Sequence, residues 1–461
     1  MVDVEPSTPL PHRLDAHPDT GPSDRGGHLA PESPRLPGSL ALRRCRRLRR
    51  AAPMGGVVAV LGVGAVLRLS FHGAIEWKRD EQWTYSHAQE MAGHAGSWPA
   101  IGMPSSIGPP NPGMSLWIFS GLFRLFGVHS PPDLAAAVQV MNVLALVAFA
   151  VFVLVAVPRA RREPWLWALG LWAANPVAVI LERKIWPPSV LPLPMVGILA
   201  AWWYRKHPAG AFAWGLVGAL MTQVHMGVAF LVLALAVWTL VHDRGAFPWP
   251  GWLAGSVLGA LPAIPWGLAV LGHRGGHAHL SAPSANFYGN WFTQFFGIGT
   301  QYTLGKHDFI DFLAGPRVGG FTTYALGAIE VVLVGVALVV LARAVRAALG
   351  TARPALGTIL LGHSRETLLI ASAFFGYGGV LTVITFSGAD SYRHYLIVIV
   401  PIVALWTAMT VLWGDRGAAR PWGRPILVVL VVLQAAMSFG LLAYINHKGV
   451  ITGDFGTSWR L

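Results

Sequence analysis

Two adjacent carboxylates, Asp80 and Glu81, follow Glu76 and the cations Lys78 and Arg79 in the stretch EWKRDEQW. Nearby cations keep a carboxylate ionised, and an ionised carboxylate can remove the proton of a hydroxyl nucleophile. The alternative is structural: Asp80 caps a helix and pairs with Lys78 or Arg79. The stretch therefore predicts either a general base or a helix cap.

The residues that follow have the spacing of an amphipathic helix over 81–92, lying on the membrane surface. Its apolar face comprises Trp83, Tyr85, Ala88 and Met91 or Ala92. Asp80 would lie near the N-cap of this helix. The helix would therefore hold the acidic pair at a fixed height beside the bilayer.

A second charged group, LERKIWPPS, ends an apolar segment at residues 181–189. Glu182, Arg183 and Lys184 lie together at the outer end of this segment, and the two cations are candidate phosphate ligands. The alternative is interfacial: the cationic side chains snorkel to the headgroups beside a Trp186 anchor.

A third group, GADSYRHY, lies between two apolar segments at residues 388–395. Arg393 and His394 would hold a phosphate by charge-assisted hydrogen bonds, and the Arg393 guanidinium offers a bidentate fork. In the alternative, Asp390 only neutralises Arg393 at the membrane boundary. Further candidates in this group are Tyr392 and Tyr395.

Isolated polar residues give weaker signals. His225 lies between two apolar segments in MTQVHMG and is either a packed residue or a functional one. Lys306 belongs to a long polar loop that also contains HRGGHAH at residues 273–279. Neither HExxH nor CxxC accompanies these histidines, so we predict no metal site from them.

The composition sets the class of protein. The chain has 461 residues, of which 54% are hydrophobic and 12% charged, and its mean hydropathy is +0.52. Soluble domains have about 25% charged residues. A soluble enzyme and a disordered protein are therefore excluded, and a polytopic membrane protein is indicated. Cys45 is the single cysteine, so no intramolecular disulfide is expected.

Apolar segments of about 20 residues, the length that crosses a bilayer, recur along the chain. We assign eleven spans: 51–71, 133–157, 164–181, 188–204, 210–223, 226–242, 251–271, 321–346, 366–386, 395–413 and 425–445. The fifth and sixth are short and are either two spans or one bent unit. We therefore predict an all-α transmembrane bundle with its C-terminus outside.

Basic residues fall on alternate loops, as the positive-inside rule requires of cytoplasmic loops. Those loops carry Arg159, Arg161, Arg162, Arg205, Lys206, Arg244, Arg343, Arg346, Arg353, Arg365, Arg416, Arg420 and Arg424. The cluster before the first span is Arg43, Arg44, Arg46, Arg47, Arg49 and Arg50. Despite a formal charge of +13, the pattern indicates membrane orientation, with a cytoplasmic N-terminus and no nucleic-acid partner.

The stretch 112–127 is apolar but short, and it contains Arg124. A crossing here would put Arg159–Arg162 outside. We therefore expect an interfacial or re-entrant helix on the outer face, with Trp117 and Phe119 as anchors.

The resulting organisation places the working face outside the plasma membrane. We predict a disordered cytoplasmic tail at 1–42, a transmembrane domain at 43–445 with large outer loops at 72–132 and 272–320, and an outer tail at 446–461. No Walker A motif is present and no GxGxxG follows a strand, which argues against ATP-driven work.

In order and spacing, four motifs resemble the GT-C superfamily of integral-membrane glycosyltransferases. Within it, the protein O-mannosyltransferase-like branch, which includes the lipid A aminoarabinose transferases, is the most similar. The resemblance covers about residues 51–413. The motifs are the Asp80-Glu81 pair that opens a helix, PPNPGMSLWIFSGLFRLFG, ERKIWPPSVLP after the third span, and RHYLIVIVP in a late span.

The resemblance implies a GT-C bundle and an inverting glycosyltransferase that uses a polyprenyl-phosphate sugar. Asp80 would be the general base that deprotonates the acceptor hydroxyl, with Glu81 as its competitor for that role. The leaving phosphate gains charge in the transition state, which Arg393 and Lys184 would stabilise. The acceptor would be a glycan, a lipid or a protein.

One departure concerns the second outer loop. Relatives often carry an aspartate near the end of the third span, whereas this chain has Glu182 there. Either Glu182 replaces that aspartate or the second carboxylate is absent. A divalent metal bridging two acids is possible only in the first case, and no other cofactor is predicted.

Two rival functions belong to other classes. A membrane transporter or lipid flippase of the cell envelope usually shows internal repeats and charges near the bilayer midplane, whereas here the charges collect at the outer ends of spans. A non-catalytic scaffold of the cell envelope would not need the crowded acids at residues 76–81.

Overall fold

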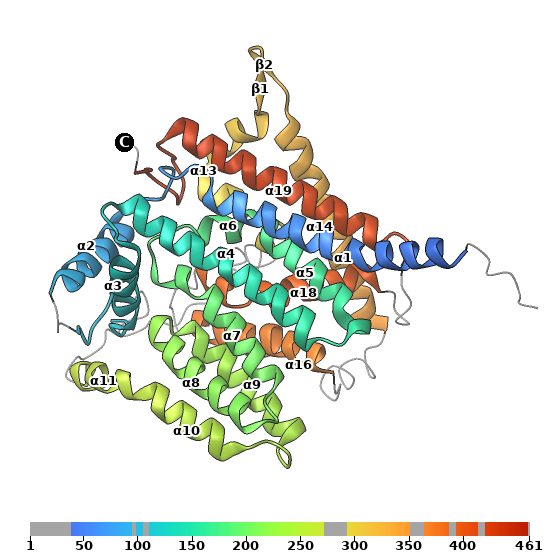
Figure 1. The fold of residues 1–461 in the computed structure, drawn as a ribbon. Helices are drawn as coiled ribbons and strands as arrows, with labels where there is room; N and C mark the ends of the chain where they lie inside the picture. Colours follow the sequence, from blue (N-terminus) through green and yellow to red (C-terminus); the bar gives the residue numbers. More distant parts are fainter. Residues whose placement is uncertain are drawn as a thin grey trace, which may run out of the picture. The chain divides into compact units, whose positions relative to one another are not determined.

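The computed structural model describes residues 38–94, 98–104, 110–271, 293–350, 364–386, 393–413 and 420–459, without the side chains of 38–53, 347–350, 383–386 and 393. This part is helical apart from one two-stranded hairpin (Figure 1), so the all-α prediction is confirmed. The packing described below concerns residues from Met54 onward, which form one unit.

Every predicted span falls largely on one helix or on a broken run of helices, although the span at 321–346 begins on a β-strand four residues before its helix. The helices are α1 (Gly38–Leu69), α4 (Pro131–Ala156), α5 and α6 (Arg162–Ala174, Pro176–Leu181), α7 (Pro192–Trp203), α8 (Pro208–Val224), α9 (Gly227–Asp243), α10 and α11 (Trp249–Ala260, Ile264–Val270), α14 (Ala325–Gly350), α16 and α17 (Arg365–Ala371, Gly378–Phe386), α18 (Val400–Leu412) and α19 (Gly423–Lys448). Short turns of 3-10 helix are η1 (Arg159–Arg161), η2 (Pro187–Val190), η3 (Leu261–Ala263) and η5 (Arg393–Val398), and η4 (Ser372–Tyr377) is a π-helix.

Four stretches of the described chain are long and apolar enough to cross a membrane alone: Pro131–Ala156, Trp249–Val270, Ala325–Arg346 and Gly423–Lys448. Together with the shorter apolar helices they define a multi-pass membrane protein. The total of eleven spans stays a prediction.

Proline breaks the third span between α5 and α6. Pro176 cannot donate a backbone hydrogen bond, so the chain restarts there. The Asn175 side chain accepts hydrogen bonds from the backbone N–H groups of Val177 and Ala178, both at 3.0 Å, and so caps α6. The third predicted span is therefore a broken helix whose second part ends at Leu181.

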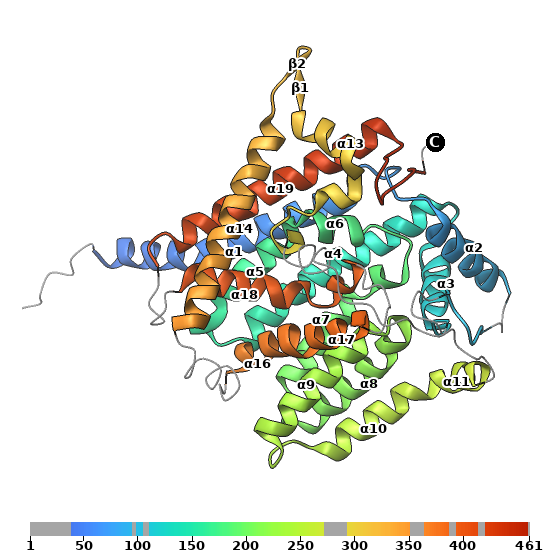
Figure 2. The same cartoon turned by 180° about the vertical axis from the view of Figure 1, so that it is seen from behind.

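Helices α8 and α9 form a hairpin of two separate helices (Figure 2). Arg205, before α8, contacts Asp243 at the end of α9 with Nη2 to Oδ2 at 2.5 Å. The start of α8 and the end of α9 therefore lie together, with His225 at the turn between them. Each helix has 17 residues, about 25 Å at 1.5 Å per residue. The bent-unit alternative is wrong.

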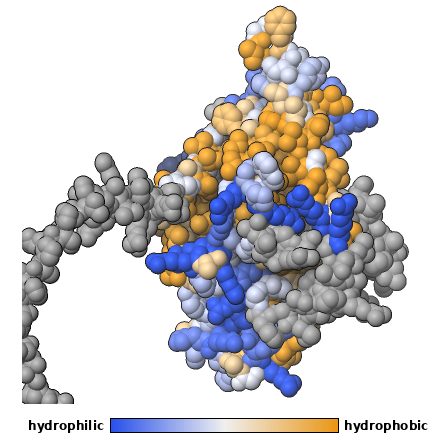
Figure 3. Space-filling view, turned by 90° about the vertical axis from the view of Figure 1, so that its right-hand side faces the viewer, coloured by the Kyte–Doolittle hydropathy of each residue, from blue (hydrophilic) through white to orange (hydrophobic). Residues whose placement is uncertain are grey.

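The predicted cytoplasmic loops meet at one end of the bundle. Arg161 pairs with Glu366 at 3.3 Å, and Arg424 pairs with Glu163 at 2.5 Å. Figure 3 looks onto this end: hydrophilic side chains gather there, and hydrophobic side chains cover the neighbouring flank. The loops that are predicted to lie on the cytoplasmic side therefore also lie together at one end of the bundle.

The first predicted outer loop forms two packed helices, α2 (Arg79–Gly93) and α3 (Met114–Phe126). Arg124, near the end of α3, donates to the carbonyl oxygens of Met91 and Ala92 at 3.2 and 3.3 Å, so α3 folds back onto α2. With 13 residues, α3 is about 20 Å long, less than the bilayer core of about 30 Å. This geometry supports an interfacial helix at 112–127.

The amphipathic helix predicted at 81–92 starts two residues earlier, at Arg79. Its buried face includes Tyr85, Ala88 and Met91, as expected. Its N-cap is Lys78, without a side-chain capping bond. Asp80 therefore lies in the first turn and does not cap the helix.

The second large predicted outer loop contributes α13 (Thr300–Ala314) and β1 (Arg317–Val318), and the start of the next predicted span contributes β2 (Phe321–Thr322). The strands pair antiparallel, with Arg317 opposite Thr322. Gly319 and Gly320 form the turn with φ of 58° and 84°, a region that favours glycine. Helix α13 packs against α14 and α19, which positions its first turn at the site described next.

Candidate active site

A cavity of about 550 Å³ opens at the end of the bundle opposite the predicted cytoplasmic loops, where the α8–α9 turn lies. Sites for small ligands span about 300–1,000 Å³. Its lining includes Lys78, Arg79, Asp80, Glu81, Lys184, His225, His394 and Asp454, with Trp83, Trp186, Tyr302 and Tyr395 as aromatic residues. The cavity therefore gathers the first outer loop, the loop after α6, the α8–α9 turn, α13, η5 and the C-terminal tail.

Glu76 holds two lysines of this cavity. Its side chain is fully buried, Lys78 Nζ lies 2.5 Å from Oε1, and the Lys184 ammonium pairs with Oε2. Burial opposes the ionisation of Lys78, but Glu76, and then Asp454 and Glu81, outweigh that effect and raise its pKa. Sequence reasoning noted Glu76 only as a neighbour of the acidic pair. Its position two residues before Lys78 was the sequence signal that could have indicated this ion pair.

Asp80 and Glu81 are adjacent but lie in different environments. Asp80 is half-exposed and lines the cavity, and within the described chain it forms no ion pair with Lys78 or Arg79. Glu81 is 1% exposed, and its Oε2 has no hydrogen-bond partner among the described residues. Burial, and then Glu76, raise the pKa of Glu81 to about 8, while Lys184 and Lys78 oppose the shift. Glu81 is therefore protonated at neutral pH, and Asp80 is the acid presented to a ligand.

Lys184 is the most enclosed cation of the cavity. Its side chain is 5% exposed, and its ammonium lies 5.3 Å from the centre of the Trp186 ring. An ammonium group has three N–H donors. Glu76 is its one ion-pair partner in the described part of the chain, so Lys184 retains donors for a ligand anion.

His225 has a fixed tautomer. The backbone N–H of Gly227 donates to its Nδ1 at 3.1 Å, so Nδ1 carries no proton and the neutral ring keeps a donor at Nε2. A Cβ at Gly227 would lie 2.8 Å from this ring, so the close approach requires glycine. His225 thus packs tightly and also lines the cavity.

Rings surround this histidine. Tyr395 lies 4.8 Å from His225 and from His394 between ring centres, and Trp186 lies 4.5 Å from His394. Aromatic pairs at these separations stabilise one another. They form a rigid wall beside Lys184.

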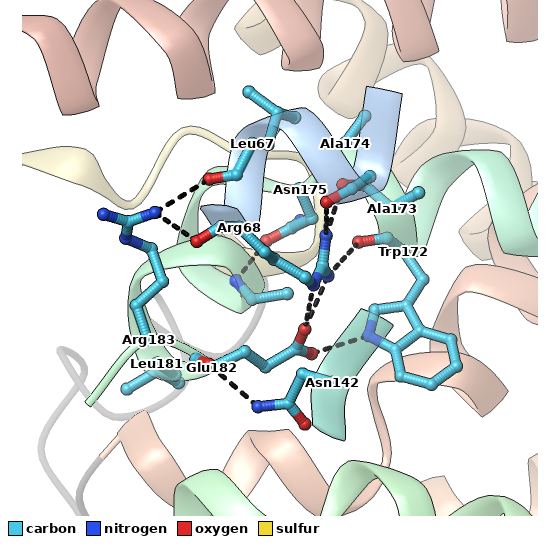
Figure 4. Close-up of polar contacts among 12 residues, drawn as sticks. Leu67, Arg68, Asn142, Trp172, Ala173, Ala174, Asn175, Leu181, Glu182 and Arg183 are labelled. Atoms are coloured by element: carbon cyan, nitrogen blue, oxygen red, sulfur yellow. Dashed lines mark hydrogen bonds and ion pairs between the residues drawn. The ribbon is translucent and has the colours of Figure 1, made fainter. Parts of the chain in front are cut away.

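Glu182 and Arg183 do not line the cavity; their side chains form hydrogen bonds with Arg68, Trp172 and the end of α1 (Figure 4). Glu182 is fully buried; its Oε2 accepts from Arg68 Nε at 2.7 Å and its Oε1 from Trp172 Nε1 at 2.7 Å. Arg183 donates to the carbonyl oxygens of Leu67, Arg68 and Phe71, at 3.2, 2.5 and 3.1 Å. These donations satisfy the C-terminal end of α1. The expectations of a second carboxylate at Glu182 and a phosphate ligand at Arg183 are therefore not supported by their positions.

Of the remaining predicted site residues, the structure describes some and leaves others outside its described part. Lys306 is exposed on α13 and does not line the cavity. The Arg393 side chain, Asp390, Tyr392 and the histidines of 273–279 lie outside the described part of the structure. Within the described residues, no group of three or more His, Cys, Asp or Glu could hold a metal ion. The bridging metal considered from the sequence therefore gains no ligand set here.

The comparisons with known proteins found structural likenesses only. No protein-family model matches the chain, and no curated protein matches it. ArnT from Cupriavidus metallidurans in the apo state is 16% identical over 86% of this chain and 76% of its own, with a TM-score of 0.49. The same ArnT bound to undecaprenyl phosphate is 14% identical over 86% and 75%, with a TM-score of 0.44.

An oligosaccharyltransferase from Archaeoglobus fulgidus in the apo form is 12% identical over 85% of this chain and 56% of its own, with a TM-score of 0.41. These proteins belong to the superfamily that the sequence motifs resemble. Because the TM-scores lie below 0.5, the function proposed next depends on the side chains of the cavity.

Proposed function

We propose that the chain is an inverting glycosyltransferase that moves a sugar from a polyprenyl-phosphate donor to an acceptor hydroxyl at the outer face of the membrane. The observation that carries this proposal is the cavity itself. It combines a half-exposed carboxylate, Asp80, with an enclosed cation, Lys184, that retains hydrogen-bond donors.

The chemistry assigns one role to each group. Asp80 removes the proton of the acceptor hydroxyl as the hydroxyl oxygen attacks the anomeric carbon. The bond between that carbon and the phosphate oxygen breaks, and the phosphate leaves with the electron pair. Lys184 binds the charge that develops there, in a site shielded from water. Protonated Glu81 cannot serve as the base at neutral pH.

The decisive experiment compares two isosteric variants, Asp80→Asn and Glu81→Gln. Purified protein in proteoliposomes would be given a panel of polyprenyl-phosphate hexoses and pentoses, and release of polyprenyl phosphate would be measured in the presence of envelope acceptors. Asp80→Asn should lower transfer on the order of 10²-fold, as expected for a lost general base, with unchanged binding of undecaprenyl phosphate. Glu81→Gln should lose less.

The result can also go against the proposal. An active Asp80→Asn with an inactive Glu81→Gln would exchange the two roles, and two active variants would remove the mechanism. The outer location is tested separately by reporter fusions after Arg162 and Arg420, which should both read cytoplasmic. An outside reading at Arg162 would make α3 a crossing helix.

A further inference from the structure

The C-terminal segment, residues 449–459, forms part of the cavity wall. One edge pairs with the strand-like stretch before α2: the Trp77 N–H donates to Thr457 O at 3.0 Å, and the Trp459 N–H donates to Ile75 O at 3.1 Å. The rings of Trp77 and Trp459 lie 4.7 Å apart, edge to face. The segment is therefore fixed to the chain that carries Glu76 and Lys78.

The other edge of the segment is fixed to α13. The Asp454 N–H donates to Tyr302 O at 3.0 Å, and Asp308 Oδ2 accepts from the backbone N–H of Thr452 at 2.6 Å. Gly453 and Gly305 touch through their backbones, since a Cβ on Gly453 would lie 2.1 Å from Gly305 N. Asp454 is thus held at a defined position in the cavity wall.

Asp454 contacts Lys78 twice. The Lys78 ammonium donates to the backbone carbonyl of Asp454 and lies 3.3 Å from its Oδ1, while Glu76 Oε1 lies at 2.5 Å. These contacts match the three N–H donors of an ammonium group. The contact with Oδ1 is the longest measured, and the Asp454 side chain is 30% exposed. A phosphate that reaches Lys78 would therefore displace this carboxylate first.

We propose that the Asp454 carboxylate is a built-in competitor for the lipid phosphate at Lys78. It occupies the ammonium donor that a phosphate would use. This competition weakens binding of the polyprenyl-phosphate product and speeds its release. The inference rests on the proposed function, because it assumes that the cavity binds a polyprenyl phosphate.

The test measures binding of undecaprenyl phosphate to the full chain in nanodiscs. Asp454→Asn keeps the size of the side chain and the backbone carbonyl contact but removes the charge. It should bind undecaprenyl phosphate about 3- to 10-fold tighter, and 1 M salt should shrink the difference because the site is partly exposed. Asp311→Asn is the matched control: Asp311 is an acid of α13 that pairs with Arg317 at 3.1 Å and does not line the cavity. Its affinity should stay within about twofold of the wild type.

A double-variant cycle separates competition from a general loss of structure. Lys78→Met should weaken binding, and Asp454→Asn should have no further effect in that background. Equal or weaker binding in Asp454→Asn alone, or a gain that persists without Lys78, would overturn the competitor role. Failure of the wild type to bind undecaprenyl phosphate would instead overturn the proposed function, so the two failures are distinguishable.

Discussion

Two clusters of charged residues in this protein contain the same kinds of side chains but have different roles. In the first, Glu182 pairs with Arg68 at 2.5 Å, and both side chains are fully buried. In the second, Glu76 pairs with Lys78 and Lys184 beside the cavity. Each cluster combines one buried glutamate with cations of the outer loops and span ends. They differ in how many hydrogen-bonding groups are left for a ligand.

The first cluster is closed. Both carboxylate oxygens of Glu182 have partners, and Arg68 also donates to the carbonyl oxygens of Gly64 and Ala173, at 3.2 and 2.9 Å. The second cluster is open, because Lys184 keeps donors and faces the cavity. A charged residue at the end of a span therefore indicates function only when its neighbours leave some of its hydrogen-bonding groups for a ligand.

The largest expected effect is on the closed cluster. Arg68→Met leaves the Glu182 charge buried without its partner, which should cost roughly 3–5 kcal/mol of unfolding free energy. Thermal unfolding in detergent would measure this loss. Glu163→Gln, at the exposed pair with Arg424, is the control and should cost less than about 1 kcal/mol. An Arg68→Met protein with normal stability and lost lipid binding would place Arg68 in the site instead.

The next effect concerns Glu81 and pH. Its pKa is about 8 in the folded protein, against 4.5 ordinarily, so between these values the folded state binds more protons than the unfolded state. Stability must then fall as pH rises through this window, by on the order of 3 kcal/mol. Glu81→Gln should remove this slope and be the more stable protein at pH 9. Parallel stability curves for the two proteins from pH 5 to 9 would show that Glu81 is not held protonated.

The smallest expected effect distinguishes the roles of the adjacent residues Arg183 and Lys184. Lys184→Met removes a charged donor to the phosphate and should weaken undecaprenyl phosphate binding by about 1.5–3 kcal/mol, or roughly 10- to 100-fold. Arg183→Met should leave that binding unchanged and lower the unfolding temperature, because Arg183 caps α1. If the two variants behave in the opposite way, the open and closed assignments must be exchanged.

The sequence predicts the helices well because apolar length is a local property, and every assigned span falls largely on helix. It also assigns Asp80 and Lys184 to predicted outer loops, and the structure brings both to one cavity together with His225. The buried ion pair of Glu182 could not be predicted from the sequence. Its partner Arg68 is 114 residues away and lies near the end of an ordinary predicted span.

Asp454 was missed for a related reason. A short polar tail after the last span carries no motif, and its role depends on backbone pairing with residues near Ile75 and Tyr302. Long-range pairing of this kind leaves no periodic signal in the sequence. By contrast, the sequence identifies Asp80 and Glu81 as two candidates for the general base but does not show which of them has that role. Burial decides between them, and adjacent helical residues point about 100° apart.

The docking of residues 449–459 has a consequence for biosynthesis. One wall of the cavity comes from the start of α2, near the beginning of the membrane domain, and another comes from the segment that follows α19. All the spans can be inserted before that segment leaves the ribosome. In the proposed topology, the nascent chain therefore carries Asp80 outside before the cavity is finished, and the proposed lipid site matures only when residues 449–459 emerge and close against the start of α2.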